Sequence, residues 1–327
     1  MRNIDVFNGD ADGIIALLQL RLAKPCDSQL ITGVKRDIQL LERVLVKPGD
    51  RVTVLDISLQ RNHDALVRML EQGASVFYVD HHQSGSIPQH PNLVTRIDQV
   101  ATQCTSTLMD SYLEGAFRTW AIAAAFGDNL TETALQLASQ QGLSDAQIGQ
   151  LRELGILLNY NGYGQHLDDL HIHPALLFRQ LLNFRDPFEL MMRSESIFTQ
   201  LQRTYHEDMN KTQMIQPHYQ SEYAALYQLP AERWSRRVSG VYSNELANSV
   251  VGRAHAVVTD NGDGTCTISV RAPVNNRQGA DVICSQFPNG GGRSAAAGIN
   301  QLPLADIGQF WQKLNQFYQS MAQSQTH

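Results

Sequence analysis

Carboxylate and imidazole side chains follow several apolar runs of the sequence, each where the run ends. The clearest case is the apolar run 76–79, which leads into a carboxylate and two imidazoles. Runs of this kind indicate buried strands of a parallel sheet, and ligands of such sheets bind beyond the carboxyl ends of the strands. If the strands are neighbours, the polar side chains that follow them converge on one rim. These side chains are Asp10, Asp12, Asp56, His81, His82 and Asp128.

Such a convergence predicts a divalent cation. Several carboxylates in a partly dry crevice repel one another unless they bind protons or a cation lies among them. Carboxylate oxygens with one or two imidazole nitrogens suit Mn²⁺ or Mg²⁺, and Fe or Zn under other supply. Each Asp alone has a simpler interpretation, because an Asp after a strand is commonly a turn former or a helix N-cap. Asp10 or Asp12 could cap a helix that starts near Gly13, but four acids with a His–His pair favour metal.

Strand and helix patterns alternate through the first half of the chain, which predicts a doubly wound, mostly parallel sheet. The expected strands are residues 4–7, 30–34, 52–55, 76–79 and 93–97, with the apolar run 121–125 as a further strand-like end before Asp128. The expected helical stretches are residues 14–23, 38–45, 61–72 and 130–158, and a helix through Leu113 after the polar cluster 102–107. Lys35 and Arg36 could face phosphate or simply lie in solvent. The loop 159–164 is either a ligand-contacting segment or a tight helix–helix turn.

The second half has a different pattern. Residues 188–215 suggest one long, mostly polar helix, and the strands expected at 254–259 and 265–271 flank a hairpin turn. An apolar stripe over residues 304–321 predicts a last helix packed on that sheet. We therefore expect an α/β chain in three parts, with a cleft between its two domains. The parts are a metal-binding catalytic domain (1–187), a helical linker (188–229) and a smaller α/β substrate-binding domain (230–327).

Composition narrows the range of functions. The chain has 327 residues, 43% of them hydrophobic, and a formal net charge of −6. Only the last part is basic, since residues 233–327 carry 8 Lys and Arg against 5 Asp and Glu. This balance does not suit a tight general DNA binder, which needs a basic surface to displace counterions. Four scattered cysteines without metal or disulfide spacing, and no apolar run long enough for a bilayer, predict a cytoplasmic protein with no membrane partner.

Five segments resemble the motifs of the DHH phosphoesterase superfamily. FNGDADG, VLDIS, VDHHQS and FGDN occur in the order of the four DHH motifs. Residues 290–298 (GGGRSAAAG) resemble the GGGH-x-x-AAG signature of the DHH-associated C-terminal domain. The resemblance spans almost the whole chain and implies the superfamily that includes RecJ exonucleases, nanoRNA/pAp phosphatases and cyclic-dinucleotide phosphodiesterases. It says little about the substrate.

The resemblance also implies metal ligands, with one departure. One ion, Mn²⁺ or alternatively Mg²⁺, would be held by Asp12, Asp56, His81 and Asp128. A second ion would be held by Asp10 and the shared Asp56, but Val6 stands where two-metal relatives usually carry a His. The resemblance therefore implies one ion or two, with an incomplete ligand set for the second.

Further residues are expected to contact substrate. His82 is either the contact to phosphate or leaving oxygen, acting as general acid, or an imidazole that only orients ligands; we count it with Asp128 as catalytic. Glycines allow backbone N–H groups to approach an anion closely, and two arginines could grip a phosphate. A glycine run alone is often a flexible turn, yet its place matches the family signature. The expected substrate-binding residues are His82, Arg271, Gly290, Gly291, Gly292 and Arg293, the last standing where the family usually has His.

These observations predict a hydrolase acting on ester bonds through metal-activated water. The expected substrates and partners are short RNA or DNA oligonucleotides, linear dinucleotides such as pApA or pGpG, and 3′-phosphoadenosine 5′-phosphate (pAp), as for a nanoRNase or an exonuclease-like enzyme. The resemblance also implies a homodimer as one possible assembly. The alternative is a degenerate DHH protein that binds a nucleotide or anion without turnover, and a third class is a protein-interaction scaffold.

Overall fold

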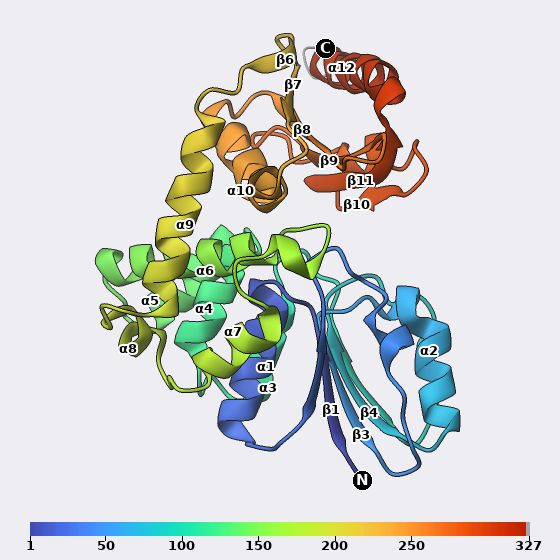
Figure 1. Cartoon of the computed structure of the whole chain (residues 1–327), viewed down its shortest axis with the longest axis vertical. Coiled ribbons are helices and arrows are strands. Elements are labelled where there is room, and N and C mark those ends of the chain that lie inside the picture. The colour runs from blue at the N-terminus through green and yellow to red at the C-terminus, as the bar shows by residue number, and fades with distance from the viewer. Residues whose placement is uncertain (325–327) are drawn as a thin grey trace. The chain divides into compact units, whose positions relative to one another are not determined.

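The computed structural model describes residues 1–324, and the chain divides into two compact units between Thr204 and Tyr205 (Figure 1). The first unit contains a five-stranded sheet in the order β2-β1-β3-β4-β5, and all its strand pairs are parallel. This confirms the predicted fold class. The strands are β1 (Asn3–Phe7), β2 (Gln29–Thr32), β3 (Arg51–Leu55), β4 (Ser75–Asp80) and β5 (Leu93–Ile97).

Register aligns the carboxyl ends of the central strands. Phe7 of β1 pairs with Leu55 of β3, and Leu55 pairs with Val79 of β4. The residues that follow Phe7, Leu55 and Val79 therefore lie at one level, so the polar residues after the three central strands lie at the same rim of the sheet.

Helices cover both faces of this sheet (Figure 1). Helix α2 lies on one face with the short helix η1, and buried side chains such as Ile4, Val54 and Tyr78 pack there. Helices α1 and α3 lie on the other face, and α1 is buried nearly all round, as its sequence predicted. The helices of this unit are α1 (Ala11–Ala23), η1 (Leu40–Arg43), α2 (Leu59–Glu71), α3 (Thr105–Tyr112), α4 (Arg118–Gly127), α5 (Thr131–Gln140), α6 (Asp145–Gly162), η2 (Leu167–Asp169), α7 (Pro174–Leu181) and α8 (Pro187–Met191), followed by α9 (Ile197–Thr212).

Several local predictions were wrong. The apolar run 121–125 lies in helix α4 and not in a strand, because alanines favour helix and a short apolar run does not distinguish the two. The stripe at 38–45 forms only the single turn η1. Residues 159–162, expected in a loop, are the last turn of α6. The stretches 130–158 and 188–215 are each broken into two helices, and Ser144 and Gln147 form a capping box at the start of α6.

The second unit is built on a six-stranded mixed sheet in the order β10-β11-β9-β8-β7-β6. Its elements are β6 (Pro217–Gln220), β7 (Ala224–Leu229), α10 (Arg233–Ser249), β8 (Ala254–Asp260), β9 (Thr265–Arg271), α11 (Ala280–Cys284), β10 (Gly290–Gly292), β11 (Ala296–Pro303), η3 (Leu304–Asp306) and α12 (Ile307–Ser324). The stretch 188–229, expected as a helical linker, thus also contains two strands of this sheet. The predicted β8–β9 hairpin and the last helix are confirmed.

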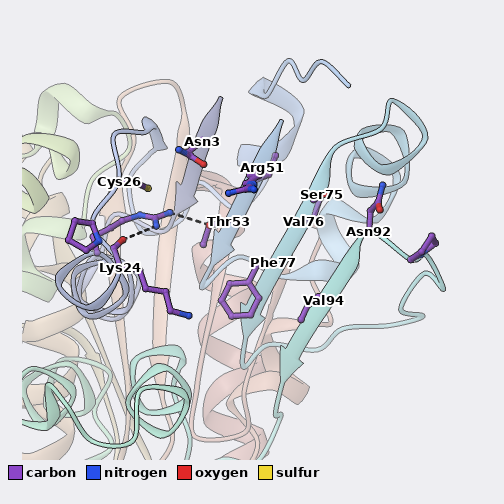
Figure 2. Close-up of a pocket in the computed structure, with 14 residues that line it drawn as sticks. Asn3, Lys24, Cys26, Arg51, Thr53, Ser75, Val76, Phe77, Asn92 and Val94 are labelled. Atoms are coloured by element: carbon purple, nitrogen blue, oxygen red, sulfur yellow. Dashed lines mark hydrogen bonds between the residues drawn. The ribbon is translucent and has the colours of Figure 1, made fainter. Parts of the chain in front are cut away.

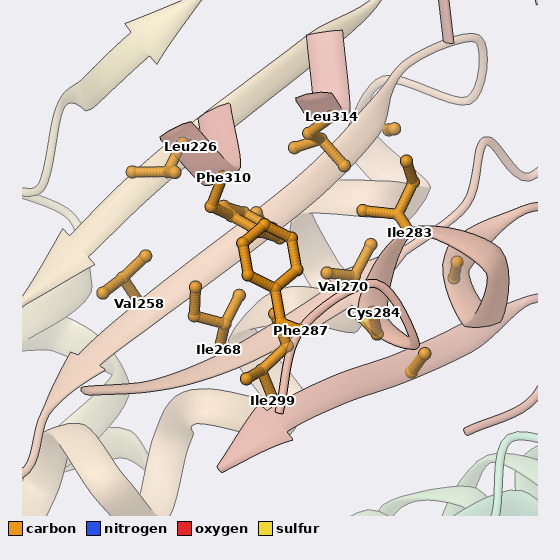
Figure 3. Packing of buried hydrophobic residues seen from close by; sticks show 14 of the residues in the cluster. Leu226, Val258, Ile268, Val270, Ile283, Cys284, Phe287, Ile299, Phe310 and Leu314 are labelled. Atoms are coloured by element: carbon orange, nitrogen blue, oxygen red, sulfur yellow. The ribbon is translucent and has the colours of Figure 1, made fainter. Parts of the chain in front are cut away.

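The core of the second unit lies between the sheet and helices α11 and α12 (Figure 3). Ile268 and Ile299 of the sheet face Phe310 and Leu314 of α12. Phe310 and Tyr318 of the last helix are therefore core residues, and Trp311 and Phe317 pack against the core. Helix α10 packs against β8 and β9, where Tyr242 contacts Tyr227 of β7. Within residues 1–324, no helix is both long enough and apolar enough to cross a membrane.

Candidate metal centre

Asp56 follows β3 in a backbone conformation that few residues adopt. Its φ is +60°, in the left-handed region, which Asp and Asn enter more readily than most residues. Its N–H donates to the carbonyl oxygen of Val79 at 3.1 Å, which ties the backbone to the neighbouring strand. The side chain is buried, and Oδ1 accepts a hydrogen bond from Thr105 Oγ1 at 3.1 Å. Unusual backbone conformations held in this way are typical of functional sites.

His81 directs its Nε2 atom at three carboxylates. Its Nδ1 lies 2.8 Å from the carbonyl oxygen of Gln103. Because a carbonyl can only accept, Nδ1 carries a proton, and the neutral ring then presents the lone pair of Nε2. Nε2 lies 3.4 Å from Asp56 Oδ1, 3.8 Å from Asp12 Oδ2 and 3.9 Å from Asp128 Oδ2. Four atoms with lone pairs thus face one small volume, an arrangement that favours a bound cation.

Asp12 lies in the first turn of α1 and accepts two hydrogen bonds from the start of α3. Its Oδ2 accepts from the backbone N–H of Thr105 at 2.8 Å, and its Oδ1 accepts from that of Ser106 at 2.7 Å. Ser106 Oγ also donates to the Asp12 carbonyl oxygen at 2.8 Å. The beginning of a helix binds an anion well because its N–H groups lack partners within the helix. The polar cluster 102–107 therefore orients a carboxylate of the site as well as beginning a helix.

Asp128 reaches the site from the end of a helix instead of a strand. It is the C-cap of α4, and close packing of α4 brings it to the rim. A Cβ atom at the preceding Gly127 would lie 2.7 Å from Ala11 Cβ and 2.8 Å from the Gly155 carbonyl oxygen. Only glycine lets α4 lie this close to α1 and α6. The sequence predicted a strand end before Asp128, whereas the structure carries this residue at the end of a helix.

Burial and like charge perturb the acid–base groups of the centre. Burial, followed by the charges of Asp12 and Asp10, raises the pKa of the Asp56 carboxyl well above its usual value. Burial, followed by the charges of Asp12 and Asp128, also raises the pKa of the Cys104 thiol. Cys104 therefore stays a neutral thiol at ordinary pH and is not a thiolate ligand. Both effects indicate excess negative charge that a cation would relieve.

His82 lies beside His81, and their rings meet edge to face at 4.6 Å. Its Nδ1 is 2.7 Å from Asp80 Oδ1, so Asp80 orients the ring. Burial alone would lower the pKa of His82, but the hydrogen bond and the charge of Asp80 raise it above its usual value. The side chain is 38% exposed, in contrast to that of His81 at 3%. His82 is therefore an accessible imidazole at the edge of the centre, and Asp80 favours its protonated form.

Asp10 is engaged elsewhere. Its Oδ1 caps α1 by accepting from the Gly13 N–H at 3.0 Å, and its Oδ2 accepts from Lys35 Nζ at 2.5 Å. Lys35 Nζ also donates to Asn159 Oδ1 at 3.0 Å and lies 3.6 Å from Asp128 Oδ1. Burial alone would lower the pKa of Lys35, but the charge of Asp10 and other nearby groups raises it, so its amine stays an ammonium.

Two groups of side chains in the centre could hold a metal ion. Within residues 1–324, the sets of three side chains whose ligand atoms lie within 4.8 Å of one another are Asp12–His81–Asp128 and Asp56–His81–His82, and Asp10 is in neither. The two sets share His81. Carboxylate oxygens with one imidazole nitrogen are the donors that Mn²⁺ and Mg²⁺ accept, and no thiolate takes part.

Comparisons with solved structures identify the fold. The chain is similar to exonuclease RecJ bound to manganese, with 16% identity, a TM-score of 0.59, and coverage of 97% of this chain and 90% of that one. It is also similar to the pGpG-specific phosphodiesterase PggH from Vibrio cholerae, with 13% identity, a TM-score of 0.55, and coverage of 98% and 99%. RecJ from Thermus thermophilus in complex with Mn²⁺ gives 16% identity and a TM-score of 0.61, and the match covers 98% of this chain but 52% of that one. The chain has the same α/β fold as these RecJ and PggH structures. Neither a protein-family model nor a curated protein matches the sequence.

Val6 belongs to the hydrophobic core of the first unit. It is fully buried in the cluster between the sheet and α2, together with Ile4, Val52 and Tyr78. An apolar side chain at this position offers no ligand atom to a second ion.

Of the residues expected to bind an anion, the glycine run and Arg293 lie at the edge of the second sheet, and Arg271 lies on β9, two strands further in. Gly290 to Gly292 form the edge strand β10, not a flexible loop. Arg293 and Ala296 exchange two backbone hydrogen bonds, and Ala296 pairs with Arg271 of β9. Because inward and outward N–H groups alternate along an antiparallel strand, the N–H of Gly292 points away from β11 toward the open edge. Two arginines and an outward N–H group thus lie close together.

Arg271 is already partly engaged. Its Nε donates to Asn244 Oδ1 at 2.6 Å, and its two terminal nitrogens donate to the carbonyl oxygens of Val270 at 3.1 Å and Gly240 at 3.5 Å. These bonds hold the guanidinium against α10. An anion could therefore bind only those N–H groups of the Arg271 guanidinium that make none of these hydrogen bonds.

A pocket of about 540 Å³ lies at the other end of the first sheet (Figure 2). Asn3, Arg51 and Ser75 line it at the starting ends of β1, β3 and β4. Its Arg21 forms an ion pair with Asp5. Because the metal-binding side chains lie at the carboxyl ends of the strands, this pocket is not part of the candidate centre.

Several residues of the centre were not identified from the sequence. The sequence gives little indication of their roles, because backbone groups and a single lysine in a loop form no recognisable motif. Lys35 was named only as a possible phosphate contact, and Asn159 only as part of a segment that could contact a ligand, whereas the structure places Lys35 against both Asn159 and Asp10. The polar cluster 102–107, which contains Gln103, Thr105 and Ser106, was expected to precede a helix, and Asp80 was assigned no role.

Proposed function

We propose that this chain is a metal-dependent phosphoesterase that hydrolyses short oligonucleotides, linear dinucleotides or nucleotide phosphates. One observation carries the proposal: the Nε2 lone pair of His81 faces the carboxylates of Asp12, Asp56 and Asp128 at 3.4–3.9 Å. Three buried or nearly buried carboxylates and an imidazole arranged in this way are costly without a cation. The same set suits the chemistry of phosphate esters, whose hydrolysis requires neutralisation of negative charge.

Different residues of the chain would bind the ion and donate the proton. A bound Mn²⁺ or Mg²⁺ would polarise a phosphate oxygen and lower the pKa of a water molecule. Asp12, Asp56, His81 and Asp128 would hold the ion, and Asp128 thereby belongs to the catalytic set. His82, oriented by Asp80, would contact the phosphate and give its proton to the leaving oxygen.

The second unit would bind the substrate's phosphate. Gly292 can present its N–H, while Arg293 and the remaining N–H groups of Arg271 can pair with phosphate oxygens. Glycine is required at position 292, because φ is +145° and a Cβ atom would lie 2.5 Å from Ala297 Cα. We therefore assign metal chemistry to the first unit and anion binding to the second.

Charge and similarity together support a short substrate. The chain carries a net charge of −6 and lacks the basic surface excess of a general nucleic-acid binder. The similar structures include an exonuclease and a phosphodiesterase specific for pGpG. A dinucleotide or very short oligonucleotide needs only one ion and a few arginines for recognition.

The test is hydrolysis of a substrate panel with Mn²⁺: pAp, pApA, pGpG and bis(p-nitrophenyl) phosphate. We expect turnover of at least one substrate, reduced about 100-fold or more in Asp128→Ala because charge stabilisation of the transition state is lost. Asp64→Asn is the matched control, since the Asp64 side chain is 89% exposed and belongs to neither set of candidate ligands.

Two results would contradict the proposal. Equal rates in Asp128→Ala and the unsubstituted protein would show that the centre does not catalyse the reaction. Tight nucleotide binding without turnover of any substrate would instead support the degenerate DHH protein, for which the buried Val6 is the structural argument.

A further inference from the structure

Lys35 occupies a position that resembles a cation site. Its Nζ contacts Asp10 Oδ2 at 2.5 Å and Asn159 Oδ1 at 3.0 Å, and lies 3.6 Å from Asp128 Oδ1. Two carboxylates and an amide oxygen are the kinds of ligand that a hard divalent ion takes. The ammonium group donates hydrogen bonds to Asp10 and Asn159 and forms an ion pair with Asp128.

The backbone around Lys35 is fixed by the loops of the site itself. Its N–H donates to the Gly162 carbonyl oxygen at 2.8 Å, and its carbonyl oxygen accepts from Asn8 Nδ2 at 3.2 Å. The preceding loop has no spare room, since a Cβ atom at Gly9 would lie 1.9 Å from the Gly33 carbonyl oxygen. The side chain is 23% exposed. The lysine is therefore held in place by its surroundings and is not a solvated strand end.

Asp128 connects this position to the metal centre. Its Oδ1 faces Lys35 at 3.6 Å, and its Oδ2 faces His81 Nε2 at 3.9 Å. One carboxylate thus lies between an ammonium on one side and the proposed ion on the other, as a bridging carboxylate lies between two metals. Both oxygens of Asp10 are engaged away from His81, because Oδ1 caps α1 and Oδ2 accepts from Lys35.

We propose that the Lys35 ammonium permanently takes the place of a second metal ion, so that the centre binds one divalent ion. The inference deepens the proposed function and rests on it, since it assumes that Asp12, Asp56, His81 and Asp128 hold an ion. One divalent ion and one ammonium supply three positive charges against the four carboxylates. Val6 is consistent with this assignment because a side chain in the core can supply no ligand to a second ion.

The test counts bound Mn²⁺ on the full chain, independently of activity. Mn²⁺ is titrated by calorimetry, and bound Mn²⁺ is examined by electron paramagnetic resonance with two equivalents present. We expect one ion per chain and the spectrum of an isolated ion. Two ions about 3.5–4 Å apart would instead give a spin-coupled signal.

Substitutions locate the effect. In Lys35→Ala, the oxygens of Asp10 and Asp128 lose their cation and the space of the side chain is opened, so we expect a second Mn²⁺ per chain. Lys35→Arg keeps the charge, and Lys47→Ala removes an exposed lysine; both should bind one ion. If Lys35→Ala does not fold, the resonance spectrum of the unsubstituted chain and the count for Lys35→Arg decide the question.

Three results would overturn the inference. Two ions or a coupled signal in the unsubstituted chain would show that Lys35 does not exclude a second metal. A folded Lys35→Ala variant that still binds one ion would show that Asp10 and Asp128 do not form a cation site. Absence of Mn²⁺ binding in the unsubstituted chain would refute the metal centre of the proposed function, and this inference with it.

Discussion

Substitution of Asp56 separates the structural role of this residue from its role in binding metal. The residue has a φ of +60°, accepts a hydrogen bond from Thr105 Oγ1, and has a carboxyl pKa raised by burial and then by the charges of Asp12 and Asp10. Asn tolerates the same backbone conformation, keeps an acceptor oxygen and carries no charge. Ala also carries no charge, but it has no acceptor oxygen and enters the left-handed region less readily.

The expected magnitudes follow from these contacts. Ala at a left-handed position costs about 1–2 kcal/mol, and an unsatisfied buried hydroxyl adds about 1–3 kcal/mol. We therefore expect metal-free Asp56→Ala to be less stable than the unsubstituted protein by about 2–4 kcal/mol. Metal-free Asp56→Asn should be as stable or more stable, because repulsion among the buried carboxylates is relieved.

With Mn²⁺ bound, the unsubstituted protein should be more stable than both Asp56 variants. In the unsubstituted protein, Mn²⁺ at one hundred times its Kd should add about 2.7 kcal/mol, and both Asp56 variants should lose most of this gain. For a unit of this size, about 1 kcal/mol corresponds to roughly 2–4 °C in Tm. Urea and thermal unfolding in EDTA and in excess Mn²⁺ measure both effects, with Asp64→Asn as control.

Two outcomes would refute this reasoning. If metal-free Asp56→Asn were destabilised as much as Asp56→Ala, the left-handed backbone conformation and the carboxylate repulsion would not determine the stability of these variants as predicted. If Asp56→Asn kept the full stabilisation by Mn²⁺, Asp56 would not be a ligand.

Three further predictions concern other parts of the chain. Gly292→Ala should destabilise the second unit by about 1–3 kcal/mol in urea unfolding, because φ is +145° and Ala297 leaves no room for a Cβ atom. Gly291→Ala is the control and should change stability by less than about 0.5 kcal/mol, because no atom lies within 4 Å of the added Cβ. Equal effects of the two substitutions would contradict the strand geometry. Burial, followed by the charge of Arg253, lowers the pKa of His255 to about 4. Between about pH 6.5 and pH 4 the folded protein therefore binds fewer protons than the unfolded chain, and its free energy of unfolding should fall by up to about 3 kcal/mol as pH falls through that window. Urea unfolding at each pH measures this change, which should be smaller in His255→Gln. His82→Gln should lower kcat by about 10²–10⁴ while the Kd for Mn²⁺ measured by calorimetry stays unchanged; a large loss of Mn²⁺ affinity would identify His82 as a ligand.

The local errors of sequence interpretation share one cause. The run 121–125 was interpreted as a strand, and residues 159–162 as a loop, from composition within a few residues. Short apolar runs suit strands and helices alike, and tertiary packing decides between them. Here Gly127 and Gly155 allow α4 to lie against α1 and α6, a contact between residues far apart in the chain.

The amino-acid sequence by itself determined the parallel sheet of the first unit, the order of the motifs and the identity of the side chains at the rim. These follow from local patterns, because apolar strands and the polar residues that end them are adjacent in the chain. Only the tertiary structure decided that the Gln103 carbonyl sets the tautomer of His81, that the start of α3 holds Asp12, and that Lys35 binds Asp10. Those contacts join residues as many as 93 positions apart, and each depends on how helices pack on the sheet, which no local pattern specifies.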